Sequence, residues 1–321
     1  MKRTAFRVLI AGLLLGFPVQ AAEILDGIKG KDDRLTMASG EYPWSAVGRV
    51  NPETRGHCTG VLVGPALVIT AAHCLYDKRK QWYVPAEQVH FVAGFRDGEF
   101  VAHTTATQYF VPGGYDALAP STVGMATNDW AFIVLRENIG LKTGWFGVSN
   151  LSRNALATIK QQGVPFVQSG YSRDKKMELT AHMGCEVEDF YRELNLLVHR
   201  CDAVPGDSGS PIFIFKDGMP YLTSIHVATT QSTKPVRGVS VPTETFVRGV
   251  LEKGDGMPQG PIEEDLLPRE TVRSFLSAMG YGGSGGQDAI VQFQTDAGLA
   301  VTGKVSYDLV GYLINAMMRA P

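Results

Sequence analysis

Residues 58–74, CTGVLVGPALVITAAHC, contain two apolar runs joined at a Gly-Pro pair, with a cysteine at each end. Valine, leucine and isoleucine dominate both runs, a composition typical of buried β-strands. Gly64 and Pro65 suit a tight turn, so the stretch predicts two strands joined at this point. Cys58 and Cys74 then lie close together at the open ends of the strand pair, where a disulfide can join them.

Similar short apolar runs recur from Tyr42 to about Val250, separated by Gly, Pro, Asn and Asp. Long helical periodicity is rare in this region. Many short strands at this spacing predict an all-β sandwich or barrel. Representative runs are SAVGRV, QVHFVAG, WAFIVL, PFVQSGY, PIFIF, YLTSIHVA and GVSVP.

The composition suits a folded protein. The 321 residues are 44% hydrophobic and 19% charged, as expected for one or two globular domains with a substantial core. The formal net charge is -2 and the pI is near 6.4. The sequence has no basic stripe interleaved with aromatic residues, so we expect no nucleic acid as a partner.

The N-terminus predicts export. Basic residues open the chain, the apolar run VLIAGLLLGF occupies 8–17, and small residues follow. This pattern is typical of a secretory signal peptide, here residues 1–21 with cleavage after Ala21. A membrane anchor is the alternative, but about ten apolar residues are too few for a bilayer core that needs roughly 20. We therefore expect a secreted or periplasmic protein without a membrane span.

The four cysteines form two pairs of equal spacing, Cys58 with Cys74 and Cys185 with Cys201. Exported proteins meet an oxidising environment, so two disulfides within these pairs are the simplest of three possible pairings. A zinc site is the alternative. It is disfavoured because the sequence has no Cys-x-x-Cys pair, and we expect no metal.

The sequence changes character after the region of short strands. Residues 252–264 are rich in Gly, Pro and acids and predict a linker. From 265 to 321 the apolar period becomes helical, in the runs ETVRSFLSAMGY, QDAIVQFQTDAG and SYDLVGYLINAMM. Gly280 and Gly298 are helix stop signals, so this segment predicts a small three-helix domain.

The motif GDSGSP at 206–211 raises the question of a nucleophile at Ser208. Glycine, serine and aspartate also make ordinary turns, so catalysis requires a base and an orienting acid elsewhere. Of the seven histidines, His73 is distinguished by an apolar run before it and Cys74 after it, although a lone histidine there is more simply a core residue. Asp129 opens the apolar run AFIVL, where an unpaired carboxylate would be costly and a histidine N–H is a suitable partner.

Three segments in the order His, Asp, Ser resemble the catalytic segments of chymotrypsin-like (trypsin-like) serine proteases: TAAHC at 70–74, NDWAFIVL at 128–135 and GDSGSP at 206–211. YPWSAVGRV at 42–50 is similar to the first strand of bacterial members. The Gly-Ser-Pro after the nucleophile pair is most similar to bacterial glutamyl endopeptidases. The resemblance covers 42–251 and implies an all-β double six-stranded barrel, with the active site between the barrels.

The resemblance implies roles residue by residue. Ser208 is the nucleophile, His73 the general base, and Asp129 the acid that orients His73. The N–H groups of Gly206 and Ser208 form the oxyanion hole, which explains the glycine. The implied activity is that of a serine endopeptidase that forms an acyl-enzyme on protein or peptide substrates and needs no cofactor.

By the same resemblance, Asp207 is a structural acid of the nucleophile loop. In trypsins the matching acid pairs with a newly cut N-terminal amine, but this chain lacks their Ile-Val-Gly-Gly start. We interpret residues 22–41 as an N-terminal extension or propeptide. Cleavage after Arg34 is one route to a new terminus.

Two residues give opposite expectations for the substrate side chain. Asp202 resembles the acid with which trypsins bind Lys or Arg, whereas His226 in SIHVATT matches the histidine with which glutamyl endopeptidases hold a carboxylate. Both cannot face one substrate group, because an anionic pocket repels a carboxylate. We favour His226 and expect cleavage after Glu, less readily after Asp, with Ala203 also in the pocket. A buried neutral histidine is the alternative for His226.

The segment 265–321 resembles the three-helix peptidoglycan-binding-like domain at the ends of many cell-wall enzymes. The pattern rests on Met279-Gly280-Tyr281, Phe293-Gln294, Gly298-Leu299 and Thr302-Gly303. It departs from the family at 282–286, where Gly282-Gly283-Ser284-Gly285-Gly286 replaces an Asp-Gly-x-Phe-Gly turn. The resemblance implies peptidoglycan as a partner and a location at the cell wall. Two alternatives stay open: helices that only stabilise or shield the protease, and a weak protease homologue that acts as a cell-wall-binding protein.

Overall fold

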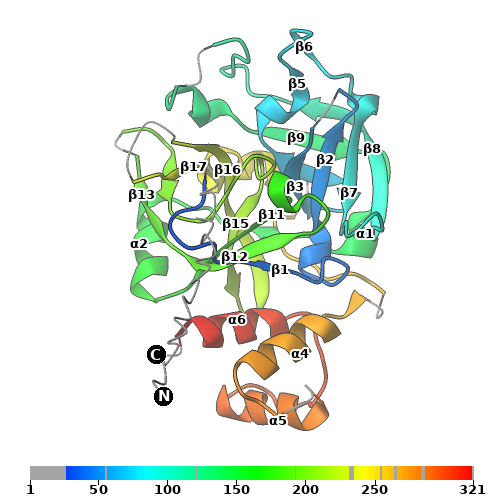
Figure 1. Ribbon diagram of the computed structural model, residues 1–321, viewed down its shortest axis with the longest axis vertical. Coiled ribbons are helices and arrows are strands. Elements are labelled where there is room, and N and C mark those ends of the chain that lie inside the picture. The colour runs from blue at the N-terminus through cyan, green and yellow to red at the C-terminus, as the bar shows by residue number, and fades with distance from the viewer. Residues whose placement is uncertain are drawn as a thin grey trace, which may run out of the picture.

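The computed structural model describes residues 27–319 except 55, 120–121, 192, 231–234, 254, 264–265 and 283–285. The predicted signal peptide lies outside the described residues. Two large β-sheets lie side by side, and the C-terminal helices cover one end of the molecule (Figure 1). In the part of the chain that is described, no helix is long and apolar enough to cross a membrane.

The first sheet closes into a six-stranded antiparallel barrel in the order β2-β3-β4-β9-β8-β7. Its strands are β2 (Val47–Pro52), β3 (Cys58–Gly64), β4 (Leu67–Thr70), β7 (Val89–Ala93), β8 (Ala102–Phe110) and β9 (Ala131–Leu135). The predicted turn at Gly64 and Pro65 joins β3 to β4. The 3-10 helix η2 (Ala72–Leu75) follows β4 and brings Cys74 to Cys58, so the first predicted disulfide is confirmed.

The second sheet is open, in the order β1-β12-β11-β15-β16-β17-β14-β13, with β10 paired to β16 outside this path. Its strands are β1 (Arg34–Thr36), β10 (Gly147–Val148), β11 (Phe166–Gly170), β12 (Thr180–Cys185), β13 (Val187–Phe190), β14 (Leu197–His199), β15 (Pro211–Lys216), β16 (Met219–Thr229) and β17 (Gly238–Pro242). The prediction of a second closed six-stranded barrel was wrong. Both edges of β12 are already paired, with β11 and with β1, so β12 has no edge left to meet β13. The second predicted disulfide, Cys185–Cys201, is confirmed.

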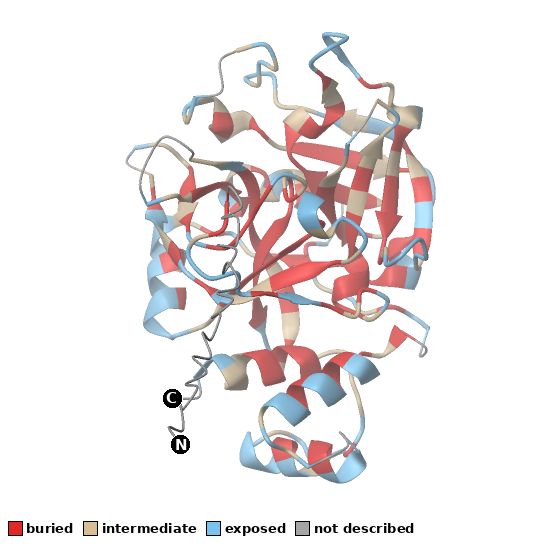
Figure 2. Ribbon diagram, in the orientation of Figure 1, coloured by how far each residue is buried: buried red, intermediate tan, exposed pale blue. Residues whose placement is uncertain are grey.

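Helices and short elements complete the fold. The α-helices are α1 (Gly140–Thr143), α2 (Arg153–Gln161), α3 (Val247–Lys253), α4 (Arg269–Ala278), α5 (Gln287–Asp296) and α6 (Leu309–Arg319). The short elements are β5 (Tyr76–Asp77), β6 (Trp82–Tyr83), η1 (Trp44–Ala46), η3 (Ala86–Gln88), η4 (Met125–Asn128), η5 (Arg173–Lys175) and η6 (Thr243–Thr245). Helices α4, α5 and α6 correspond to the three predicted C-terminal helices. Buried residues concentrate in the two sheets and on the inner faces of these helices (Figure 2).

The C-terminal helices share one hydrophobic core with the sheets. Gly311 on α6 touches the turn after β15 so closely that a Cβ atom there would lie 2.2 Å from the carbonyl oxygen of Gly218. The Asn315 side chain donates a hydrogen bond of 3.3 Å to the carbonyl of Phe215. At the start of α4, the Glu41 carboxylate accepts from the N–H groups of residues 270 and 271. These contacts attach α6 to the β15–β16 hairpin and α4 to the turn at Glu41, while the boundary at 264/265 stays a prediction.

Candidate active site

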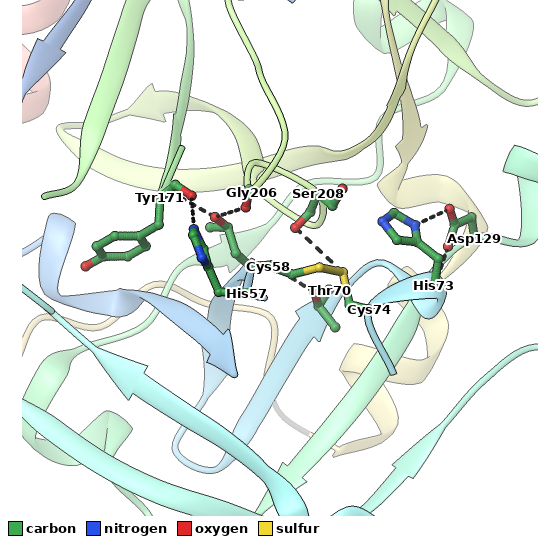
Figure 3. The surroundings of a disulfide bond; sticks show 10 residues. His57, Cys58, Thr70, His73, Cys74, Asp129, Tyr171, Gly206 and Ser208 are labelled. Carbon is green, nitrogen blue, oxygen red and sulfur yellow. Dashed lines mark hydrogen bonds and ion pairs between the residues drawn. A yellow bond between two sulfur atoms is a disulfide. The ribbon is translucent and has the colours of Figure 1, made fainter. Parts of the chain in front are cut away.

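His73 and Asp129 are brought together by the first barrel. His73 lies in η2, directly after β4, and Asp129 lies between η4 and β9. The Nδ1 atom of His73 is 2.7 Å from Oδ2 of Asp129, and the His73 backbone N–H donates to Oδ1 at 2.9 Å. The carboxylate therefore holds both the ring and the backbone of His73, as Figure 3 shows.

The electrostatic surroundings of His73 favour its protonated form. Burial by itself lowers the pKa of His73, but the charge of Asp129 and its hydrogen bond outweigh this and raise the pKa above 6.5. A base whose protonated form is stabilised in this way takes up a proton more readily than an ordinary histidine.

Ser208 lies on the other side of the imidazole. In Figure 3, His73 stands between Asp129 and Ser208, with the ring edge that faces away from Asp129 directed toward the serine. Among the described contacts, no hydrogen bond joins Ser208 to His73. In free enzymes such a bond is often long and tightens only with substrate. The structure thus brings together the three residues that the sequence motifs singled out.

The loop around Ser208 leaves two N–H groups available. Neither the N–H of Gly206 nor that of Ser208 donates a hydrogen bond to another described residue. Gly206 has φ +105°, and a Cβ atom there would lie 2.5 Å from the carbonyl oxygen of Tyr171. A side chain at 206 would therefore distort the backbone that presents these two donors. An oxyanion hole requires such donors in a fixed position, so the glycine is needed here.

Asp202 faces the N-terminal segment. Its Oδ1 accepts the N–H of Lys29 at 2.7 Å, and its Oδ2 accepts the N–H of Asp33 at 3.1 Å. The Nδ1 atom of His182 lies 3.3 Å from the same Oδ2. The N–H of Ala203 contacts this segment too, through the carbonyl of Gly27. The buried carboxylate of Asp202 is thus occupied by the protein itself.

His226 lies beside the nucleophile loop and contacts a histidine that the motifs did not identify. Its carbonyl accepts the N–H of Gly209 at 2.7 Å, and its Nδ1 is 3.1 Å from Nε2 of His199. Burial, together with the charges of Lys29 and His73, lowers the pKa of His226 to about 3. The ring is therefore neutral near pH 7.

The contact between the two histidines crosses an intervening strand. His199 is on β14 and His226 on β16, while β17 lies between them. The two rings meet because β17 has Gly238 at this point, where a Cβ atom would lie 2.1 Å from the His199 ring. No local sequence signal indicates a pair formed two strands apart.

A cleft of about 970 Å³ extends from the His73–Asp129 pair along β16. Tyr115 and Phe190 are among its lining residues, and Arg237 is another. Among the described residues, two groups of side chains meet the spacing of metal ligands. One consists of Cys58, His73 and Cys74, whose sulfurs form a disulfide, and the other of Asp33, His182 and Asp202, whose buried carboxylate already has the partners described above.

Comparison with known proteins gives a consistent set of relatives. A protein-family model described as Trypsin matches residues 34–249, more than half of the chain. Glutamyl endopeptidase of Bacillus licheniformis is 29% identical over 201 residues, which are 61% of this chain and 57% of that protein. Serine protease 23 of Homo sapiens is 28% identical over 209 residues, 58% of this chain and 50% of that protein. The chain therefore spans about half the length of these curated relatives.

Solved structures show the same fold. A Glu endopeptidase in complex with MPD superposes with a TM-score of 0.57 at 23% identity, covering 71% of this chain and 99% of that one. Protease Anisep from Arthrobacter nicotinovorans superposes with a TM-score of 0.51 at 18% identity, covering 68% and 98%. At these identities the likeness extends to the fold alone.

Proposed function

This chain belongs to the trypsin family of serine proteases, and on that premise we propose that it is an endopeptidase with Ser208, His73 and Asp129 as its catalytic residues. The observation that carries the proposal is the double contact of Asp129 with the ring and the backbone of His73. This contact fixes the ring so that Nδ1 carries a proton and Nε2 is free to act as a base.

The reaction follows from this arrangement. Nε2 of His73 takes the proton of the Ser208 hydroxyl while the serine oxygen forms a bond to the peptide carbonyl carbon. The N–H groups of Gly206 and Ser208 stabilise the oxyanion that develops. The protonated His73 gives its proton to the leaving amine, and an acyl-enzyme forms. Water, deprotonated by the same histidine, then releases the acid and restores the serine.

A fluorophosphonate probe tests this assignment directly. It should label Ser208 in the wild-type protein, and the Ser208→Ala variant should not be labelled. Ser169→Ala is a matched control, because Ser169 is a buried serine whose hydroxyl forms no hydrogen bond with a described residue. Labelling that persists in Ser208→Ala would show that another residue is the nucleophile.

For the substrate side chain we propose Glu, and less readily Asp, held by His226. The neutral state of both buried histidines supports this proposal. If His199 donates its Nε2–H to Nδ1 of His226, the remaining N–H of His226 is at Nε2 and can bind a carboxylate. The atom left without a partner is then Nδ1 of His199, an acceptor, which costs less than an unpaired donor.

Profiling on a peptide library decides the preference. The wild type should cleave mainly after Glu, and His226→Ala should lose that preference. His90→Ala, a change in the other sheet, should keep it. Dominant cleavage after Lys or Arg would contradict the proposal. Asp202 could bind such a basic side chain only by leaving its contacts with Lys29 and Asp33.

Peptidoglycan binding by 265–321 and export both stay predictions. The contacts of α4 with Glu41 and of α6 with β15 support the alternative that the helices stabilise the protease. Co-sedimentation of the full chain with purified peptidoglycan tests wall binding, and the mass of the mature N-terminus tests export. A chain that sediments but is never labelled by the fluorophosphonate would favour the wall-binding homologue instead.

A further inference from the structure

The loop that carries Ser208 is held by a second segment, residues 171–173, which directly follows β11. The N–H of Arg173 donates to the carbonyl of Pro205 at 2.7 Å. The hydroxyl of Ser172 donates to Oδ2 of Asp207, also at 2.7 Å. The first bond holds the residue before Gly206, and the second holds the side chain of the residue between Gly206 and Ser208. The N–H groups assigned to the oxyanion hole belong to these two neighbours.

Thr59 on β3 completes the support from the first barrel. Its hydroxyl donates to the carbonyl of Gly206 at 3.0 Å and accepts the N–H of Tyr171 at 2.9 Å. Its own N–H donates to the carbonyl of Ser208 at 2.8 Å. One buried threonine thus ties the two sides of the loop to residues 171–173.

Asp207 is the charged member of this network and is held by neutral groups. Its Oδ2 accepts the Ser172 hydroxyl and the N–H of Val204, while Oδ1 has no described partner. No described cation forms an ion pair with it: the charges of Arg34 and Lys29 act on it from a distance, and Arg34 is itself paired with acids at 32 and 174. Burial raises the pKa of Asp207 to about 6.

Ser172 is as buried as the carboxylate it contacts and has no exposed surface. Removing its hydroxyl would leave Asp207 with the Val204 N–H as its one described donor. A buried carboxylate that loses a hydrogen bond is strongly destabilised, so the loop would shift to give it a new partner. The position of Gly206 and Ser208 therefore depends on this hydroxyl in addition to the bonds from Thr59 and Arg173.

We propose that Ser172 is a positioning residue that holds Asp207 and, through it, sets the nucleophile loop in its active geometry without a newly cut N-terminal amine. This inference rests on the proposed function, since it concerns the same serine. Cleavage after Arg34, the route to a new amine that the sequence offered, does not fit the fold. The side chain of Arg34 is 1% exposed, so a protease cannot reach it in the folded protein.

The test compares Ser172→Ala with Ser172→Thr and Ser169→Ala in the full chain. Ser172→Ala should slow fluorophosphonate labelling and lower kcat by about 10- to 100-fold with little change in KM, because a smaller fraction of molecules has a competent loop. Ser172→Thr keeps the hydroxyl and should recover most of the activity. Ser169→Ala removes a hydroxyl that contacts no described partner and should behave as wild type.

Hydrogen exchange of the peptide 203–211 gives a readout that does not require activity. Exchange should accelerate in Ser172→Ala and stay unchanged in Ser169→Ala. If the wild type is not labelled at all, the proposed function fails, while exchange still decides whether Ser172 holds the loop. Equal labelling and equal exchange in Ser172→Ala and Ser169→Ala would overturn the inference.

A second variant applies if Ser172→Ala does not fold. Asp207→Asn removes the charge but keeps an oxygen that accepts from Ser172, so labelling within about threefold of wild type is expected. A loss of 100-fold or more would show that the loop requires the negative charge of Asp207 and not only its hydrogen bond with Ser172, and would overturn the inference.

Discussion

The two sheets of this protein are completed in different ways. The first is a closed barrel built from residues 47–135, and each strand pairs with two neighbours. The second sheet has two free edges, β1 and β13, and uses strands from 34–242. Segments from both ends of the chain cover it: residues 27–36 add β1 and bind Asp202, and α6 packs against β15.

This difference separates the tasks of the active site. The base and its orienting acid lie in short segments attached to strands of the closed barrel, His73 in η2 after β4 and Asp129 before β9, and the Cys58–Cys74 disulfide joins η2 to β3. The nucleophile loop and the predicted pocket lie in the open sheet, where contacts between distant residues set the geometry. We therefore expect changes near His73 to alter the chemistry at constant stability, and changes at the open sheet to alter stability or the fraction of competent molecules.

The largest expected effect tests the first half of this comparison. Asp129→Asn should lower kcat by about 10^4-fold, because the amide no longer fixes the tautomer or stabilises the charged form of His73. Ser208→Ala and His73→Ala should abolish proteolysis. Thermal unfolding and steady-state kinetics check these variants together. A large drop in melting temperature in Asp129→Asn would mean that the closed barrel depends on this contact and would weaken the comparison.

The next effect concerns the N-terminal segment. Asp202→Ala leaves the N–H groups of Lys29 and Asp33 without their acceptor, so the free energy of unfolding should fall by about 2–4 kcal/mol. Asp33→Ala is the matched control, because Asp33 contributes its backbone N–H and its side chain is exposed. Chemical denaturation measures both. Equal stability of the two variants would show that residues 27–36 are dispensable to the open sheet.

The sequence predicts the features that depend on neighbours in the chain or on a recognised motif. The hairpin at Gly64, both disulfides and the three C-terminal helices are of this kind. It does not predict β1 or the occupation of Asp202, because backbone N–H groups carry no sequence signal and the partners lie far apart in the chain. The Ser172–Asp207 contact escaped prediction for the same reason. A second closed barrel was expected from family likeness, which gives no information about the added edge strand β1.

A third, smaller effect concerns the packing of α6. Gly311→Ala places a methyl group against the carbonyl of Gly218 and should lower the free energy of unfolding by about 1–3 kcal/mol, despite the better helix propensity of alanine. Gly124→Ala is the control, because its backbone is helical and the nearest atom to a Cβ there is 3.9 Å away. Differential scanning calorimetry compares the two. If Gly311→Ala is as stable as Gly124→Ala, α6 is a loosely attached helix, in keeping with a separate wall-binding module.

The smallest expected effect is a change in the pKa of His73, the base held beside the closed barrel. Asp129 raises the pKa of His73 above 6.5 against the effect of burial, whereas burial lowers the pKa of His57, which contacts the carbonyl of Tyr171 and not Asp129. NMR titration of Ser208→Ala should therefore give a midpoint above 6.5 for His73 and below 6.5 for His57. Adding Asp129→Asn should move only the His73 midpoint, and downward, because burial then acts without the compensating charge.

The raised pKa of His73 also determines how the stability of the folded protein depends on pH. Because the folded pKa of His73 is raised, its contribution to stability is fully present below pH 6.5 and is lost as the pH rises through the folded pKa. Activity needs the neutral ring, so kcat/KM should rise over the pH range in which this contribution disappears. A His73 midpoint below 6.5, or one that Asp129→Asn leaves unchanged, would show that the contact seen between these residues does not control the base. The first half of the comparison, in which the closed barrel sets the chemistry of the base, would then be wrong.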